Sequence, residues 1–201
     1  EDGIRDDLVT GVQTCALPIS KLTPNGGTYA SWCDTLGYAI FDGPIELEIG
    51  GVILEKCYPR LVDIWDELSN PMVGNQTGVD LMILKSDNLA STQYNATKDI
   101  DLLIELPFWF SRKDNMSLPI LAMPSQDIKI NFKLKSFSDV INYDGSEPDD
   151  VFITDSSVIA DYIYLDDFIA TEFLNTKHTF LIDQMQFNGT EFIPANTSIY
   201  N

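Results

Sequence analysis

LPFWFSR, residues 106–112, and DIKINFKLK, residues 127–135, are the two stretches that decide the fold class. In the first, three aromatic residues follow one another, so an extended chain would carry rings on both of its faces. In the second, apolar and polar residues alternate, which is the period of a strand with one buried and one exposed face. A strand buried on both sides and then a half-exposed strand predict a β-sandwich. The predicted core positions are Leu106, Phe108, Trp109, Phe110, Ile128, Ile130 and Phe132.

The composition argues against some classes of function. The 201 residues include 31 Asp and Glu against 12 Lys and Arg, which gives a formal net charge of −19. Direct binding to nucleic acid is not expected, because a phosphate backbone is recognised by clustered Lys and Arg. The basic cluster Lys129, Lys133 and Lys135 is predicted to be the exposed face of a strand. No apolar run approaches the roughly 20 residues of a membrane-spanning helix, so no transmembrane segment is expected.

Cysteine and histidine positions argue against a zinc site. Cys15, Cys33 and Cys57 form no CxxC pair, and the single histidine is His178. We expect Cys33 and Cys57 to be reduced, partly buried thiols, with a disulfide between them as the alternative. His178 is predicted to be a structural, hydrogen-bonded residue at the start of a strand. No metal or other cofactor is expected.

Local patterns place the other elements. In residues 45–49, Ile45, Leu47 and Ile49 share one face of a predicted strand and the two glutamates share the other. This run and residues 52–56 flank Gly50-Gly51, which predicts a β-hairpin because glycine supplies the positive φ of a tight turn. Residues 59–70 carry apolar residues at helical spacing, so they predict a short helix with its acidic side chains in water. Its apolar face would consist of Leu61, Ile64, Trp65 and Leu68. Further predicted elements are a core strand at 99–110, a strand pair or bent strand within 151–165, an amphipathic turn or helix at 166–175 and a strand at 178–187.

Two groups of carboxylates could be offered as sites. Asp66 and Glu67 on the predicted helix could be a catalytic pair, but a solvated helix face explains them better. Residues 138–150 form an acidic loop that could attract calcium, although it lacks the D-x-D-x-D-G spacing. A hydrated loop is the preferred interpretation. The carboxylates that cluster in it are Asp144, Glu147, Asp149 and Asp150.

Residues 1–20, EDGIRDDLVTGVQTCALPIS, are predicted to be non-native. They lack an initiator Met and the order of residues that marks a signal peptide. Reverse translation in one frame resembles the constant parts of a short-read sequencing adapter, with Asp7 and Leu8 at the variable index. We therefore leave the segment out of the fold prediction, with an authentic but disordered N-terminus as the alternative. The natural chain is expected to extend upstream of Lys21 and beyond Asn201.

Six motifs occur together in an order typical of one family. They are IELEIGG (45–51), WDELSN (65–70), ELPFWFSR (105–112), LPILAMPSQDIKINFKLK (118–135), SSVIADYIYLD (156–166) and HTFLIDQMQF (178–187). Over about residues 36–187 the chain resembles the major capsid proteins of nucleocytoplasmic large DNA viruses. The resemblance implies an all-β jelly-roll sandwich with one short helix, the first of two tandem jelly rolls. Residues 21–165 would be this jelly roll without its first strands, 166–177 a linker, and 178–201 the start of the second jelly roll.

The resemblance implies a structural function and no enzymatic activity. Subunits of this family would trimerise into pseudo-hexagonal capsomers that tile an icosahedral shell. The expected partners are copies of the chain, neighbouring capsomers and minor capsid proteins, in a virion assembled in the host cell cytoplasm. Many relatives carry a run of Arg where this chain has DDFIATEFLN (166–175), so the basic contacts of the linker are in question.

Two alternatives stay open. The chain could be a carbohydrate-binding or hydrolytic jelly roll in which Trp32, Trp65 or Trp109 stacks on sugar, or it could be a minor capsid protein. The chain also carries N-glycosylation sequons, for which Asn-rich loops are the simpler explanation. The sequon residues are Asn75, Asn95, Asn115, Asn188 and Asn196.

Overall fold

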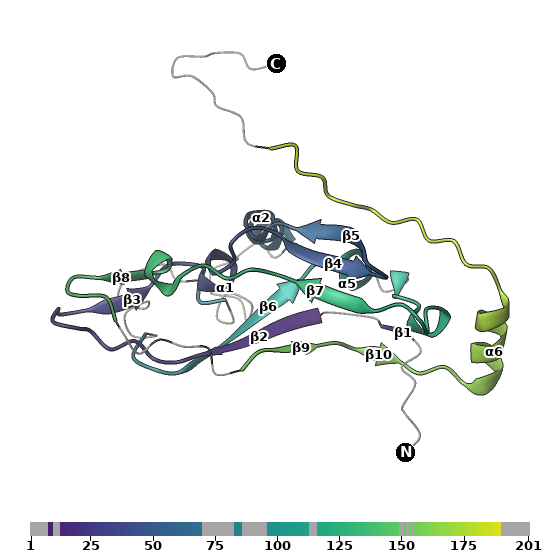
Figure 1. Ribbon diagram of the computed structural model, residues 1–201, viewed down its shortest axis with the longest axis horizontal. Coiled ribbons are helices and arrows are strands. Elements are labelled where there is room, and N and C mark those ends of the chain that lie inside the picture. The colour runs from purple at the N-terminus through teal and green to yellow at the C-terminus, as the bar shows by residue number, and fades with distance from the viewer. Residues whose placement is uncertain are drawn as a thin grey trace, which may run out of the picture.

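A computed structural model describes residues 8–9, 13–69, 83–85, 96–112, 116–148, 151, 153 and 155–189 (Figure 1). The strands are β1 Leu8–Val9, β2 Gln13–Ile19, β3 Ala30–Trp32, β4 Ile45–Ile49, β5 Val52–Cys57, β6 Ile100–Leu106, β7 Ile128–Asn131, β8 Ile141–Tyr143, β9 Ser157–Ile159 and β10 Tyr162–Ile163. The helices are α1 Leu36–Ala39, α2 Pro59–Ser69, α5 Trp109–Arg112 and α6 Asp167–Asn175, with short 3-10 turns η2 Ile120–Ala122 and η3 Phe137–Asp139.

The strands form antiparallel sheets around one hydrophobic core. Two sheets have three strands each, in the orders β6-β2-β9 and β5-β4-β7, and two smaller sheets pair β1 with β10 and β3 with β8. In Figure 1 the strands β2 and β9 run below β4 and β5. Leu17 of β2, Leu47 of β4 and Leu102 of β6 are fully buried in a single cluster. The predicted β-sandwich is confirmed, whereas the expectation of one short helix is too low, because α1 and α5 also form.

The Gly-Gly hairpin is confirmed. Gly50 and Gly51 adopt φ values of 58° and 81° between β4 and β5, a conformation that disfavours side chains with a Cβ. In β4 the apolar residues are buried and Glu46 and Glu48 are half-buried, as their alternation predicts. The register shifts by a β-bulge between Leu47 and Glu48.

LPFWFSR is buried as predicted, but it is not a strand. The strand β6 ends at Leu106, and the aromatic residues turn into α5. Pro107 explains the break, because proline has no N–H to continue a ladder and fixes its own φ. The amides of Ser111 and Arg112 then donate to the carbonyl of Phe108, which closes a helical turn. Three rings are therefore buried by a turn that tucks them inward, rather than by sheets on both sides of an extended chain.

The alternation of DIKINFKLK is confirmed over a longer range than its strand. The strand β7 covers only residues 128–131, yet Ile128, Ile130 and Phe132 all lie half-buried against the core while their neighbours are exposed. Phe132 meets the ring of Phe41 edge-on, with 5.6 Å between the ring centroids. These three core positions are less buried than the aromatic residues of 108–110, which are almost completely inaccessible.

Residues 13–19 take part in the fold, so leaving residues 1–20 out of the prediction was wrong. The strand β2 pairs with β6 over its whole length and with β9 over residues 14–16. Cys15, Leu17 and Ile19 alternate into the core and are almost fully buried. Pro18 pairs with Asp101 of β6 and, among the described residues, lies beyond the stretch of β2 that pairs with β9, a place that tolerates a missing N–H. The adapter origin of the segment stays a prediction.

The helix α2 confirms the predicted helix but not its buried face. Val62 and Asp66 are buried, whereas Trp65 is 47% exposed and Leu68 is 74% exposed. The spacing of apolar residues identifies a stripe on the helix. Which face of the helix is buried depends on the elements that pack against it. The prediction that Asp66 faces water is therefore wrong.

The C-terminal part also departs from the prediction. The helix α6 forms within the predicted range, and the Asp166 carboxylate caps it by accepting a 2.9 Å hydrogen bond from the amide of Ile169. Residues 178–187 form no strand, so that prediction was wrong. They run as an extended segment from α6 back over β5, drawn in yellow-green in Figure 1.

Candidate functional site

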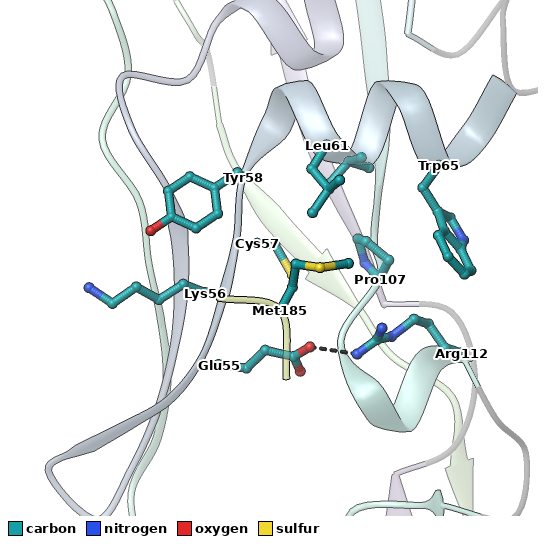
Figure 2. A pocket seen from close by; sticks show the side chains of 10 residues that line it. Glu55, Lys56, Cys57, Tyr58, Leu61, Trp65, Pro107, Arg112 and Met185 are labelled. Atoms are coloured by element: carbon teal, nitrogen blue, oxygen red, sulfur yellow. Dashed lines mark hydrogen bonds and ion pairs between the residues drawn. The ribbon is translucent and has the colours of Figure 1, made fainter. Parts of the chain in front are cut away.

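A small pocket lies where β5, α2 and α5 meet the C-terminal segment (Figure 2). Its free space is about 30 Å³, which holds about one water molecule and no substrate. Figure 2 shows Met185 of the C-terminal segment projecting toward Cys57 and Pro107. The residues that line it are Glu55, Lys56, Cys57, Tyr58, Leu61, Val62, Trp65, Pro107, Arg112 and Met185.

A buried carboxylate ties β5 to α5 at the floor of this pocket. The Glu55 side chain is only 2% exposed, and the Arg112 side chain is 22% exposed. Glu55 Oε1 accepts a hydrogen bond from Arg112 Nη2 at 2.7 Å, and Oε2 accepts from the amide of Trp109 at 2.9 Å. Burial raises the pKa of Glu55, while the Trp109 amide and the Arg112 charge act in the opposite direction. Both oxygens are occupied by structural partners, so Glu55 is placed to hold the fold.

The same arginine reaches the C-terminal segment. Arg112 Nη2 also donates to the backbone carbonyl of Asp183 at 3.0 Å. Gln184 Nε2 donates to the carbonyl of Leu54 on β5. The ring of Phe187 packs on that of Tyr58 with their centroids 4.9 Å apart. Two hydrogen bonds and one ring contact thus hold this segment against Arg112 of α5, Leu54 of β5 and Tyr58.

Sequence reasoning did not identify Glu55 or Arg112. A signal was present in the strand, because Glu55 lies two residues before Cys57 and so shares its inward face. An acidic residue on a buried face requires a partner. The partner, Arg112, follows the aromatic run but is 57 residues away in the chain. Only the fold brings the two together.

The predicted carboxylate pair on α2 does not form a site. Asp66 is buried, whereas Glu67 makes an ion pair with Lys85 at 2.8 Å. The two neighbours therefore occupy different surroundings. Across the described ranges, no group of three or more His, Cys, Asp and Glu side chains is placed to hold a metal ion.

In the acidic loop, Asp144 organises local structure. Its carboxylate accepts hydrogen bonds from the amides of Thr28 and Tyr29, at 2.7 and 3.0 Å, and from the Thr28 hydroxyl. These bonds hold the pKa of Asp144 below its ordinary value. Part of the predicted loop also pairs as β8 with β3. Asp149 and Asp150 lie outside the described residues.

The cysteines and the histidine are structural. Cys15, Cys33 and Cys57 are free thiols, in agreement with the prediction for Cys33 and Cys57. Burial raises the pKa of Cys33 to about 11 and that of Cys57 to about 12, so neither is a reactive thiolate near neutral pH. His178 Nε2 lies 2.7 Å from the carbonyl of Phe173, which gives the predicted hydrogen bond without a strand.

The remaining predicted positions are scattered. Trp32 and Trp109 are buried, so of the three tryptophans proposed to stack on sugar only Trp65 is accessible. Asn188 is exposed. The other sequon residues, Asn75, Asn95, Asn115 and Asn196, lie outside the described residues. Glycosylation stays a prediction.

In the part of the chain that the structure describes, no helix combines the length and apolarity needed to cross a bilayer.

Comparisons with known proteins identify the family. The family model for the major capsid protein N-terminus matches residues 6–166, which includes most of the predicted adapter segment. The major capsid protein of Pyramimonas orientalis virus is 33% identical over 150 residues, which cover 73% of this chain and 36% of that protein. The major capsid protein of Phaeocystis pouchetii virus is 25% identical over 94% of this chain and 42% of that protein.

The fold gives the same answer. A quasi-atomic model of the PBCV-1 virus capsid superposes with a TM-score of 0.73 and 26% identity, over 96% of this chain and 44% of that chain. This likeness confirms the predicted jelly roll. The chain spans less than half the length of the relatives it matches. By its sequence and its fold, the chain belongs to the major capsid protein family and carries the N-terminal part of such a protein.

Proposed function

We propose that this chain is the first jelly roll of a structural subunit that builds the shell of a large DNA virus. The observation that carries the proposal is the joint match, in sequence and in fold, to major capsid proteins. On this proposal residues 166–177 are the linker and residues from 178 onward enter a second jelly roll. The coverage of 44% of the PBCV-1 chain supports it, because it leaves length for a second domain of similar size.

In the proposed subunit, two jelly rolls in tandem trimerise into a pseudo-hexagonal capsomer. Exposed apolar side chains supply surface for such contacts, since large accessible apolar groups mark places where a protein meets a partner. They are concentrated in the C-terminal third of the described chain. They include Ile159, Tyr164, Phe168, Leu174 and Leu181. Neighbouring capsomers and minor capsid proteins are the proposed further partners, in a virion assembled in the host cytoplasm.

A structural rather than catalytic role fits the pocket. Its free space of about 30 Å³ is too small for a substrate, and both carboxylate oxygens of Glu55 are engaged in hydrogen bonds within the fold. A sugar-binding role would depend on Trp65. Titration of the chain with oligosaccharides, followed by tryptophan fluorescence, tests this alternative. Saturable quenching that is lost in Trp65→Ala would favour it.

The proposed assembly is tested with a chimera. In it, this chain is joined to the part of the Pyramimonas orientalis virus protein that it does not span. Size-exclusion chromatography with light scattering should give three times the mass of one subunit, and negative-stain images should show particles of pseudo-hexagonal outline. A folded chimera that stays monomeric at high concentration would contradict the proposal.

A further inference from the structure

The strand β5 is an edge strand among the described residues, since its sheet has the order β5-β4-β7. A free edge presents unpaired backbone groups that another segment can bind. Residues 183–187 lie along this edge, and a side chain rather than a backbone ladder makes the polar contact, from Gln184 to the Leu54 carbonyl. A groove of about 460 Å³ remains between them, lined by β5 residues and by residues 184–188.

The contacts of this segment have the period of an extended chain. Met185 enters the pocket and Phe187, two residues on, packs on Tyr58. Just before them, the Asp183 carbonyl accepts from Arg112. Arg112 Nη2 also donates a hydrogen bond to the buried Glu55 carboxylate, which fixes the position of the arginine side chain. The arginine therefore joins the core of the jelly roll to the backbone of the segment.

We infer that Glu55, Arg112 and the pocket that receives Met185 form a clasp, which docks residues 183–187 of the same chain onto β5 and α2. The clasp sets where the chain leaves the first jelly roll and so orients whatever follows. That second part rests on the proposed function, because it requires the second jelly roll that the chain enters from residue 178 onward. The docking itself does not, since all of its residues are present in this chain.

Limited chymotrypsin digestion of this chain tests the docking. Leu181 is 83% exposed and makes a reference cleavage site, whereas Phe187 is 56% exposed and its ring packs on Tyr58. We expect cleavage after Phe187 to be slower than after Leu181 and to rise about tenfold relative to it in Met185→Asp. This variant leaves the Glu55–Arg112 pair intact, so it does not depend on the tolerance of the core. The matched control, Thr179→Asp, adds the same charge at an exposed position and should leave the ratio unchanged.

Two results would overturn the inference. One is equal cleavage at Phe187 and Leu181 in the unaltered chain, and the other is a ratio that Met185→Asp does not change. In the chimera, Met185→Asp should lower the yield of trimer while circular dichroism shows both parts folded. If the chimera forms trimers and Met185→Asp does not change the ratio of cleavage at Phe187 to cleavage at Leu181, the clasp is refuted and the proposed function is not. A monomeric chimera with a protected Phe187 would remove the proposed function and support the docking.

Discussion

Arg112→Met is predicted to destabilise the chain through the charge that it leaves behind. The substitution removes the cation and keeps a long apolar side chain beside a pocket that is already apolar. Glu55 would then be a carboxylate with 2% exposure and no cationic partner, held only by the Trp109 amide. Breaking a buried ion pair from one side costs about 3–5 kcal/mol. Because Arg112 is 22% exposed and the amide bond remains, we expect about 3 kcal/mol, the lower end of that range.

Urea unfolding at pH 7, followed by tryptophan fluorescence, measures this loss. About 3 kcal/mol corresponds to a change of roughly a hundredfold in the unfolding equilibrium. Glu55→Gln in the Arg112→Met background removes the unpaired charge. The double variant's loss in free energy of unfolding should therefore be smaller, by at least about 1 kcal/mol, than the sum of the losses in the two single variants. The matched control is Lys56→Met, which breaks the neighbouring pair with Glu46, whose two side chains are 43% and 23% exposed. It should change stability little.

The reasoning would be refuted if Arg112→Met unfolded at the same urea concentration as Lys56→Met. It would also be refuted if the two single losses were simply additive. A pH series adds an independent check on the cause. Because the folded pKa of Glu55 is raised above its unfolded value, protonation favours the folded state. The deficit of Arg112→Met should therefore shrink as the pH falls through the folded pKa of Glu55.

Three further predictions concern other parts of the chain. Trp109→Asp places a charge without a cationic partner among buried rings, and it should abolish soluble trimer in the chimera, as measured by size-exclusion chromatography. Asp144→Asn should lower stability at neutral pH, because the depressed pKa of Asp144 means that its contribution is present above the ordinary value of about 3.9 and is lost as the pH falls through the folded pKa. Urea unfolding of both chains at pH 7 and at low pH measures this. Cys57 should react with a thiol reagent at pH 8 far more slowly than after unfolding, and more slowly than the less buried Cys33.

Each of these has a contrary result. Normal trimer yield from Trp109→Asp would show that the ring is not part of the core. A stability difference for Asp144→Asn that stays constant down to the lowest pH would remove the charge as its cause. Labelling of Cys57 at the rate seen in urea would mean that the pocket opens freely.

Pattern and composition predicted which residues are buried better than the path of the chain. Alternation placed Ile45, Leu47 and Ile49 inside, and the aromatic run of LPFWFSR is buried as expected. The path after Leu106 was missed because burial of a ring does not say whether its backbone is extended or turned. Pro107 is the local signal for the turn, because proline ends the strand that the aromatic pattern alone would extend.

Elements whose cover comes from distant residues were the hardest to predict. The α2 stripe is clear from its period, but Trp65 and Leu68 stay exposed because the core reaches the helix at Val62 and Asp66. Residues 178–187 have the composition of a strand, yet in the described chain no strand pairs with them, and hydrogen bonds that involve the side chains of Arg112 and Gln184 join them to the jelly roll. The Glu55–Arg112 pair depends on a contact across 57 positions of sequence, which no local window contains.

The position of β2 has a consequence for how such sheets tolerate replacement. Between β6 and β9 the requirements are an extended backbone and a small or branched apolar group at every second position, which Cys15, Leu17 and Ile19 meet. These requirements are generic, so many unrelated heptapeptides could occupy the same track. A segment of foreign origin can therefore be as well packed as an inherited one.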